Sequence, residues 1–438
     1  MDAQGPKPLG FGPSPFLTML NIVAICLVLT ALMAYVNHRF IKLPTAIGVM
    51  AVALIFSLVL VVLDGLGVAR ELHDAEVSFL SSIDFSDVLM QGMLSFLLFA
   101  GALHIDLSEL KAFRWQVGSL AVVSTVLSTL LVGYALFYAL PVVGLNLPLM
   151  YCLLFGSLIS PTDPIAVMGI LKSARAPQEV SLVIAGESLF NDGVGVVIFS
   201  LLLGMLASGM APSMAHGLEL LAHEAGGGLI LGLVLGYVAF RLLRSVDNYQ
   251  VEVLLTLATV VGGYALAAKL HVSGPLAMVV AGLIVGNHGR ALAMSDTTRR
   301  YVDMFWELID EILNAVLFVL IGLEVLLIDF SVNELIGIAL AIGVTLLARL
   351  LTVGLPVGIT HKAFNLPAGS WKVLTWGGLR GGISVALALS LPMGAERDTV
   401  LALTYGVVVF SILGQGMSIG AITKRALGGA VDKEGGRH

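Results

Sequence analysis

The sequence predicts a single all-α membrane domain, residues 1–438, with thirteen transmembrane helices, and two observations support this class. Hydrophobic residues make up 58% of the chain and charged residues only 12%, with a mean hydropathy of +0.99. Soluble domains carry about 25% charged residues, so the composition excludes an ordinary soluble fold. The apolar residues also gather in runs of roughly 20, the length that crosses a bilayer about 30 Å thick.

The apolar runs follow one another with short connections, and no segment between them is large or polar enough to form a separate soluble domain. The first run is preceded by Gly and Pro instead of basic residues, and no small-residue cleavage pattern follows it, so we expect a spanning helix and not a signal peptide. A seventh run at about 227–243 is expected to link two halves. In order, the runs begin near Phe16, Thr45, Val88, Val117, Pro148, Val180, Gly227, Val251, Val272, Met304, Val332, Trp371 and Thr399.

Basic residues are unevenly divided between the two sets of loops. Because Lys and Arg concentrate on the cytoplasmic side, we predict a protein of the inner cell membrane with its N-terminus outside and a short cytoplasmic tail at 426–438. The cytoplasmic set carries Arg39, Lys42, Lys111, Arg114, Lys172, Arg175, Arg241, Arg244, Arg290, Arg299, Arg300, Lys362, Lys372, Lys424, Arg425, Lys433 and Arg437. The opposite set carries Lys7, Arg70, Lys269 and Arg397.

Two of the runs are interrupted by helix-breaking residues. The fifth contains Ser-Pro-Thr-Asp-Pro at 160–164 and the twelfth contains Gly-Gly-Leu-Arg-Gly-Gly at 377–382, and both are expected to unwind at mid-depth. By helix count they hold equivalent places in two six-helix units, at about 15–210 and 250–425, which predicts inverted repeats. Such a matched pair is the strongest sequence pointer to the binding site of a secondary transporter.

The sixth run carries Glu187, Ser188, Asn191 and Asp192 where a membrane helix normally has no charge. An intramembrane acid costs about 2.5 to 3.5 kcal/mol on insertion scales and by default marks an ion path or a proton relay. Ser188 and Asp192 share one helix face, and Glu187 and Asn191 share a second face rotated by about 100°. We expect the first face to offer oxygen ligands to a cation and the second to contact neighbouring helices.

Arg349 and Arg380 lie inside apolar runs and are the natural counter-ions for these acids. The alternative to an ion site is that both carboxylates are paired scaffold, since a buried charge is tolerated when it is paired. Glu187 is the better candidate for a fixed pair, with Arg349 or Arg380. Asp192 is the better candidate for binding an ion.

Other polar residues have structural interpretations beside functional ones. Asp163 before Pro164 suits a helix N-cap, and an anionic cap also offsets the helix dipole beside a cation site. Thr162 can add an oxygen ligand, and Arg380 can balance a half-helix C-terminus. The acids at 303–311 suit a plain interfacial helix end. No catalytic motif occurs in a credible context, so we expect no enzyme, no cofactor and no nucleic-acid partner.

Through these motifs the chain resembles the bacterial NhaP-type sodium/proton antiporters, of the cation/proton antiporter group 1 that includes the animal exchangers. The most specific parts are 160–164, 186–193 and 377–381, and the likeness spans nearly the whole chain. It implies an NhaA-like fold with thirteen helices and a homodimer in membrane lipid. It also implies alternating access, in which a core of six helices carries the ion past a dimerisation domain.

The resemblance also implies a role for each polar residue of the breaks and the sixth run. Asp192 is similar to the carboxylate that binds the cation and the proton, with Ser188 and the Thr162 backbone as further sodium ligands. Asp163 is similar to the acid at the crossing of the two unwound helices.

Asn191 resembles the neutral member of an Asn-Asp pair, which in this family is associated with electroneutral exchange, and Glu187 resembles an acid that pairs with an arginine on the eleventh helix, here Arg349. One position departs from the pattern. Many relatives carry an acid on the third helix where this chain has Ala100, so the site has one carboxylate fewer.

The sequence therefore predicts electroneutral exchange of one Na⁺ or Li⁺ for one H⁺, which compete for Asp192, with a role in pH and sodium homeostasis. Exchange of K⁺ for H⁺ is the first alternative, because Ala100 removes a ligand. A symporter of an organic anion is less favoured, since Asp163 and Asp192 would repel an anion. An ion channel is the weakest alternative.

Overall fold

The computed structural model describes residues 15–65, 93–174, 176–208, 222–324 and 331–434, and every regular element in these ranges is helical. The predicted all-α class is therefore confirmed. By length and composition, eight described helices are apolar enough to cross a membrane: Asn21–Ile41, Thr45–Leu63, Arg114–Val143, Gln178–Ala207, Ala222–Leu243, Tyr249–Leu270, Val332–Thr360 and Ala395–Leu427.

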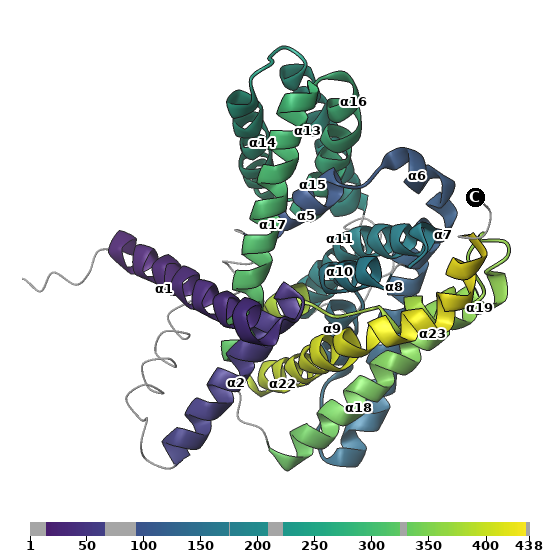
Figure 1. Cartoon of the computed structure of the whole chain (residues 1–438). Coiled ribbons are helices and arrows are strands. Elements are labelled where there is room, and N and C mark those ends of the chain that lie inside the picture. The colour runs from purple at the N-terminus through teal and green to yellow at the C-terminus, as the bar shows by residue number, and fades with distance from the viewer. Residues whose placement is uncertain (1–14, 66–92, 175, 209–221, 325–330, 435–438) are drawn as a thin grey trace, which may run out of the picture.

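Figure 1 shows the order of the helices along the chain. The first half contains α1 (Pro15–Val36), α2 (Thr45–Gly65), α5 (Leu94–Leu103), α6 (Leu107–Ala112), α7 (Arg114–Gly118), α8 (Thr125–Ala139), α9 (Leu149–Ile159), α10 (Ile165–Ser173) and α11 (Gln178–Ser208). The second half contains α13 (Gly227–Leu243), α14 (Tyr249–Leu270), α15 (Gly274–Ile284), α16 (Arg290–Leu292), α17 (Asp296–Glu324), α18 (Val332–Arg349), α19 (Leu355–Thr360), α20 (Ser370–Trp376), α21 (Gly382–Leu389), α22 (Ala395–Val409) and α23 (Gly416–Glu434).

Several of these helices continue through short turns of different pitch. Turns of π-helix cover Asn37–Ile41, Ser119–Ser124, Ala222–Gly226, Val285–Gly289, Leu350–Gly354 and Phe410–Gln415, and a 3₁₀ turn covers Leu140–Val143. Turns of π-helix often occur at functional sites. The turn between α22 and α23 is relevant below, because two of its side chains reach the broken segments.

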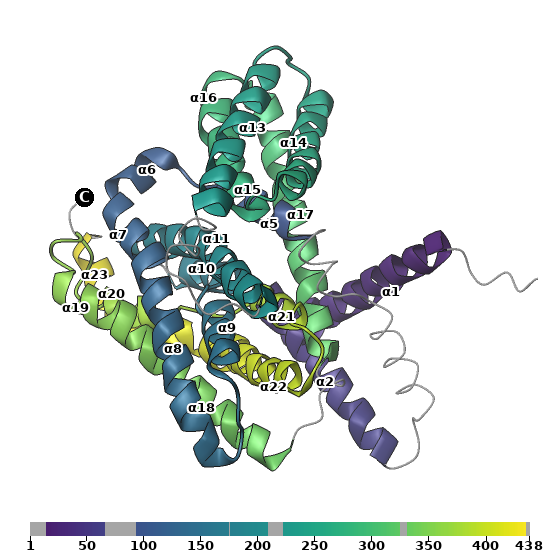
Figure 2. The same cartoon turned by 180° about the vertical axis from the view of Figure 1, so that it is seen from behind.

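The helices form two bundles, which Figures 1 and 2 show from opposite sides. The larger bundle packs α8, α9, α11, α18 and α20 to α23 around a core that includes Phe155 and Tyr405. The smaller bundle packs α13, α14 and α15 with α5 and the first half of α17 around Trp306. Helix α11 also contacts α15, so the sixth run lies where the two bundles meet.

Helix α17 passes from one bundle to the other. In its first half Trp306 packs on Phe99 of α5, with 4.8 Å between ring centroids. In its second half α17 packs on α2, where Val319 and Leu323 join a small apolar cluster with α1 and α2. The sequence placed the start of this helix near Met304, eight residues too late, because its first two turns are polar and a search for apolar runs does not detect them.

Two spanning segments are broken in the middle, as the Pro and Gly runs predict. Helix α9 ends at Ile159 and α10 begins at Ile165, while α20 ends at Trp376 and α21 begins at Gly382. Both connections lie inside the larger bundle, where protein surrounds the unpaired backbone, as membrane proteins require. The other expected starts agree within a few residues, except that the start near Val88 lies outside the described residues.

Close contact between α5 and α15 requires glycine on the facing surface. A Cβ atom on Gly282 would lie 2.7 Å from the Phe99 carbonyl oxygen and 2.8 Å from the Ala102 Cβ. Backbone atoms cannot move aside as a flexible side chain can. We therefore predict that Gly282→Ala destabilises the protein by about 1 to 3 kcal/mol, the usual cost of overpacking, measured as a lower thermal-unfolding midpoint in detergent.

Gly262→Ala on α14 is the matched control, because nothing lies within 4 Å of a Cβ at that position. It should leave stability unchanged or raise it, since Ala favours helix over Gly by about 1 kcal/mol. Equal unfolding midpoints for the two variants would contradict the close packing of α5 on α15.

Candidate functional site

The two broken segments cross and satisfy each other's backbone groups. The Asp163 amide donates to the Leu379 carbonyl at 2.8 Å. The Arg380 Nη1 donates to the carbonyl oxygens of Ser160 and Pro161 at 2.7 and 2.8 Å. These carbonyls lose their helical partners at the break, and an unpaired buried carbonyl costs free energy. The guanidinium therefore lies at the C-terminal end of α9, and the expected charge-balancing role of Arg380 stays a prediction.

A second set of bonds fixes the Gly-rich segment from the turn between α22 and α23. The Arg380 amide donates to Ser411 Oγ at 2.8 Å, and Ser411 Oγ donates to Gln415 Oε1 at 2.8 Å. Gln415 Nε2 donates in turn to the Trp376 carbonyl at 3.0 Å. The π-helical turn thus places one polar side chain at each end of the break between α20 and α21: Gln415 at Trp376 and Ser411 at Arg380.

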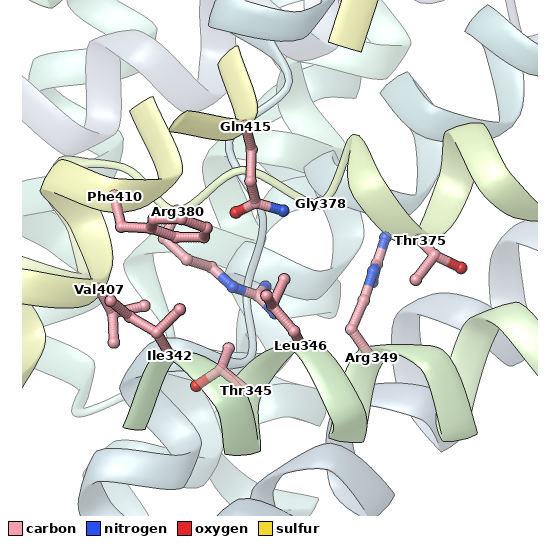
Figure 3. A pocket seen from close by; sticks show the side chains of 10 residues that line it. All are labelled: Ile342, Thr345, Leu346, Arg349, Thr375, Gly378, Arg380, Val407, Phe410 and Gln415. Atoms are coloured by element: carbon pink, nitrogen blue, oxygen red, sulfur yellow. The ribbon is translucent and has the colours of Figure 1, made fainter. Parts of the chain in front are cut away.

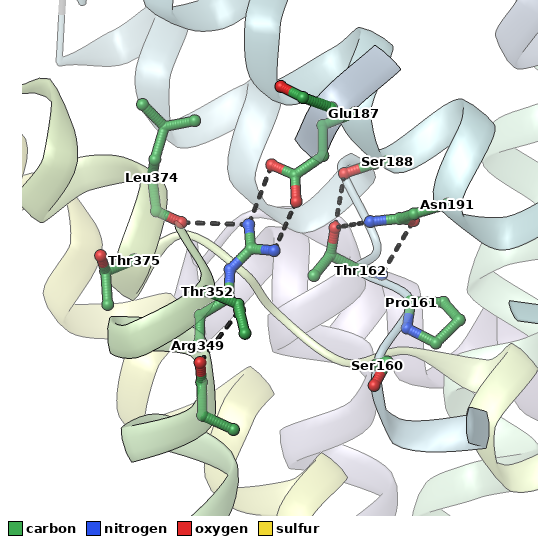
Figure 4. A network of polar contacts seen from close by, with 12 residues as sticks. Ser160, Pro161, Thr162, Glu187, Ser188, Asn191, Arg349, Thr352, Leu374 and Thr375 are labelled. Carbon is green, nitrogen blue, oxygen red and sulfur yellow. Dashed lines mark hydrogen bonds and ion pairs between the residues drawn. The ribbon is translucent and has the colours of Figure 1, made fainter. Parts of the chain in front are cut away.

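Thr162 connects the first break to the sixth run on α11, as Figure 4 shows. Its amide donates to Asn191 Oδ1 at 3.2 Å, and Asn191 Nδ2 donates to Thr162 Oγ1 at 3.0 Å. Thr162 Oγ1 and Ser188 Oγ lie 2.9 Å apart in a further hydrogen bond. All three side chains are buried. Asn191 thus holds the break against α11, which agrees with its expected contact with a neighbouring helix.

Glu187 faces away from this network and pairs with Arg349 on α18. Arg349 Nη2 donates to Glu187 Oε2 at 3.0 Å and Nη1 donates to Oε1, so the pair is bidentate. Arg349 Nη2 also donates to the Leu374 carbonyl at 3.1 Å. The two side chains are almost fully buried. Of the two arginines left open by the sequence, the structure therefore places Arg349 on Glu187 (Figure 4).

Asp192 has a different environment from Glu187 on the same helix. It is 7% exposed, and among the described residues its carboxylate has no hydrogen bond or salt bridge. The charges that act on it are those of Asp163 and Arg380. Arg380 already donates to two carbonyls, so it offers Asp192 its charge without a direct bond. A carboxylate held this way keeps its oxygens available for an ion or a proton.

Asp163 and Asp310 place two further acids beside the crossing. Asp163 is half-buried and packs against Gly381, where a Cβ atom would collide with its side chain. Asp310 on α17 is half-buried, lies within electrostatic range of Asp163 and accepts a hydrogen bond from Asn314 Nδ2 at 3.1 Å. The sequence interpretation assigned Asp310 to a plain interfacial end and missed this placement. The spacing of Asp303, Asp310 and Asn314 along one helix face was the available signal.

Ala100 lies in the apolar core of the smaller bundle. Its side chain is fully buried in the cluster around Trp306, and the neighbouring Gly101 faces Leu189 of α11. Helix α5 therefore contacts the sixth run and contributes no carboxylate to it. Asp310 approaches the crossing from α17 instead.

A small cavity lies behind the crossing, between Arg349, Arg380 and Gln415, as Figure 3 shows. Its volume is about 10 Å³, which is the room of a single water molecule. Thr345 also lines it, from α18. The cavity is too small for a hydrated cation, so it belongs to the packing of the two arginines and is not an ion path.

The Glu187–Arg349 pair generates a stability prediction. Removing one partner of a buried ion pair leaves an uncompensated charge and typically costs about 3 to 5 kcal/mol. We expect Glu187→Gln to lower the thermal-unfolding midpoint strongly, and Glu187→Gln combined with Arg349→Met to recover part of the loss.

Glu311→Gln is the control, because Glu311 is exposed on α17 and its removal should change little. A Glu187→Gln variant as stable as this control would show that the pair is not a structural element. Full additivity of the Glu187 and Arg349 variants would show the same, since coupled residues deviate from additivity.

Comparison with known proteins places this geometry in a family. Residues 27–425 match the family model described as "Sodium/hydrogen exchanger, transmembrane". The chain is 55% identical over 427 residues to the Na⁺/H⁺ antiporter NhaP of Pseudomonas aeruginosa, covering 96% of this chain and 100% of that protein. It is 35% identical over 415 residues to the Na⁺/H⁺ antiporter NhaH of Halobacillus dabanensis, with 94% and 97% covered.

The fold has a solved counterpart as well. The sodium proton antiporter MjNhaP1 from Methanocaldococcus jannaschii, determined at pH 8, matches with a TM-score of 0.73 and 20% identity, covering 94% of this chain and 99% of that one. At this identity the likeness concerns the fold alone. With the family model spanning nearly the whole sequence, the chain belongs to the sodium/hydrogen exchanger family and resembles its NhaP-type antiporters.

Proposed function

We propose that this protein is an electroneutral antiporter that exchanges one Na⁺ or Li⁺ for one H⁺ by alternating access, with both ions competing for Asp192. The observation that carries the proposal is the contrast on α11. Glu187 is fixed by Arg349, whereas Asp192 is buried beside the crossing without a hydrogen-bond partner among the described residues. The relatives named Na⁺/H⁺ antiporters support the same ions, and we infer a role in pH and sodium homeostasis.

The proposed cation ligands are oxygens from both sides of the crossing. Asp192 supplies a carboxylate and Ser188 a hydroxyl from α11, while the Thr162 backbone contributes from the break and Asp163 lies next to it. Hard cations prefer such oxygen ligands. Asn191 holds Thr162 in place through two hydrogen bonds, so its proposed role is to position the break and not to bind the ion.

The charges around the crossing support a ratio of one to one. Glu187 and Arg349 cancel each other. Asp163, Asp192 and Arg380 together carry a net charge of −1 when both acids are ionised. One Na⁺ or one H⁺ brings this group to zero, so the two loaded forms have the same charge, and their exchange moves no net charge. Asp310 must then keep one protonation state throughout the cycle.

The net charge of Asp163, Asp192 and Arg380 also explains why sodium movement and proton movement are coupled. A group of net charge −1 is costly to move through a low-dielectric medium, whereas a neutral group is not. The change between outward- and inward-facing states is therefore unfavourable when the site is empty and favourable when Na⁺ or H⁺ is bound. Coupling of sodium to proton movement follows from this penalty without any further contact.

We also propose the finer architecture implied by the resemblance. The described helices group into thirteen segments if α6 counts as a connection, helices joined by a π-helical turn count as one, and the broken pairs α9 with α10 and α20 with α21 count as one each. On this grouping the two breaks hold equivalent places in two inverted units. We propose a homodimer in the inner cell membrane with the N-terminus outside and the C-terminal tail in the cytoplasm.

K⁺ is the rival cation, and one observation favours considering it. Ala100 is buried in an apolar cluster and provides no ligand from α5, so the site has fewer charges to replace the tightly held water of Na⁺. The oxygen ligands at Thr162 and Ser188 remain. The relatives' names favour Na⁺. An organic anion is disfavoured, because Asp163 and Asp192 would repel it.

Asp192→Asn tests the site. The amide removes the charge that binds the cation and the group that takes up the proton. In liposomes with an imposed Na⁺ gradient, we expect proton flux to fall to the level of liposomes without protein.

The control is Asp398→Asn, an exposed acid at the start of α22, which should transport normally. Sodium-driven proton flux at the normal rate in Asp192→Asn would refute the assignment of Asp192 as the exchanging carboxylate.

The stoichiometry and the cation are tested together in the wild type. With one positive charge exchanged for another, proton flux driven by a Na⁺ gradient should be the same with the membrane potential clamped at zero and at negative values. Flux that changes with voltage would contradict one-to-one exchange. Titration of Na⁺, Li⁺ and K⁺ should show saturation by Na⁺ and Li⁺, and saturation by K⁺ alone would overturn the sodium proposal.

A further inference from the structure

A cavity of about 280 Å³ lies between the two bundles, away from the crossing. Val196, Val197 and Ser200 line it from α11, and residues at the C-terminal end of α14 and the start of α15 close the other sides. His271, which lines the cavity, is exposed, so the cavity reaches the surface. A water molecule occupies about 30 Å³ in the liquid, so the space suits a small cation with several waters.

The cavity continues the helix face that carries Asp192. Asp192, Val196 and Ser200 are spaced four residues apart and share one side of α11. Two of them line the cavity and the third is the proposed ion-binding acid. The cavity therefore lies directly along α11 from Asp192, towards the helix end at Ser208 that we predict to be extracellular.

Leu276 on α15 contacts α11 next to Asp192. The residue after Asp192 is Gly193, and a Cβ atom there would lie 2.6 Å from Leu276 Cδ2 and 3.2 Å from Cγ. The leucine side chain thus rests on the backbone of α11 beside the site, and only 7% of it is exposed. Pro275, the residue before it, lines the cavity. Leu276 therefore follows a lining residue on α15 and contacts the residue after Asp192 on α11.

The lining carries groups that suit a hydrated cation. Glu224 contributes a carboxylate, and Ser200 and Tyr264 contribute hydroxyl groups. Glu224 is positioned by its backbone, whose carbonyl accepts a hydrogen bond from the Ser273 amide at 3.0 Å. A carboxylate that lines a low-dielectric cleft raises the local concentration of cations.

We propose that this cavity is the extracellular vestibule through which a hydrated monovalent cation reaches or leaves Asp192, with Leu276 on Gly193 as the closing contact and Glu224 as the group that attracts the cation. The proposal rests on the proposed antiport. It adds a location for the outer path, the residue that closes it and a second carboxylate outside the exchange site. The path opens when α11 and α15 separate at the Leu276–Gly193 contact.

Ser200→Cys tests the path, because a bulky group attached there would stop α11 from closing on α15. The two native cysteines, Cys26 and Cys152, are buried, so labelling of the unsubstituted protein gives the background level. We expect a membrane-impermeant methanethiosulfonate added from the extracellular side to label the variant and abolish sodium-driven proton flux, whereas the unlabelled variant transports normally. Ser157→Cys, fully buried in α9, is the matched control and should stay unlabelled.

Three results would overturn the proposal: labelling with undiminished flux, labelling only from the cytoplasmic side, or no labelling from either side. These outcomes are distinct from failure of the antiport itself, which the flux of the unlabelled variant and the loss in Asp192→Asn report separately.

A second variant tests the cation without a bulky group. Glu224→Gln should raise the apparent KM for extracellular Na⁺ about fivefold, the effect of one charge near a cation in water, with the maximal rate unchanged. Asp398→Asn removes an acid on the same predicted side, outside the cavity, and should leave KM unchanged. Equal KM values for Glu224→Gln and Asp398→Asn would remove Glu224 from the path.

Discussion

The rest of this structure depends on the crossing of two broken helices, because membrane protein backbone must find hydrogen-bond partners inside the protein. At the crossing, one arginine provides several of these hydrogen bonds. The Arg380 side chain satisfies two carbonyls of the first break, and its own amide is held by Ser411. The first break is held by the second through the Asp163 amide and the Leu379 carbonyl. Extended backbone therefore lies at the centre of the larger bundle, where it can offer oxygens to an ion.

The polar residues of helix α11 point in different directions and contact different neighbours. Glu187 points to α18 and is fixed by Arg349, while Ser188 and Asn191 contact Thr162 of the break. Asp192, one residue further round the helix, meets neither set of partners. The same short motif thus supplies a structural ion pair, a group of hydrogen bonds to the broken segment, and an acid whose oxygens have no hydrogen-bond partner among the described residues. An acid that moves between a proton and a cation needs this separation, because a fixed arginine partner would hold it ionised at all times.

Much of this arrangement was predictable from the sequence, because its causes are local. Pro161, Pro164 and the glycines from 377 break helices whatever surrounds them, and intramembrane acids are rare enough to mark a site. Helical spacing did not choose between Arg349 and Arg380 for Glu187, since it fixes the face of a residue and not the neighbour opposite it; only the family resemblance implied Arg349. Asp310 was missed for a related reason. Acids near a polar helix end suit an interface equally well, and only the packing of α17 on α5 and the larger bundle brings Asp310 near Asp163.

Asp310 and Ala100 both bear on the proposed exchange of one Na⁺ for one H⁺. Helix α5 carries the buried Ala100 and no acid, whereas Asp310 on α17 lies within electrostatic range of Asp163. Asp310 also accepts a hydrogen bond from Asn314 Nδ2. The ratio of ions exchanged is set by the acids that change state during the cycle and not by the number of acids present. Glu187 is fixed by Arg349, so the proposed one-to-one exchange assigns the change of state to the group formed by Asp163, Asp192 and Arg380 and requires Asp310 to keep one protonation state.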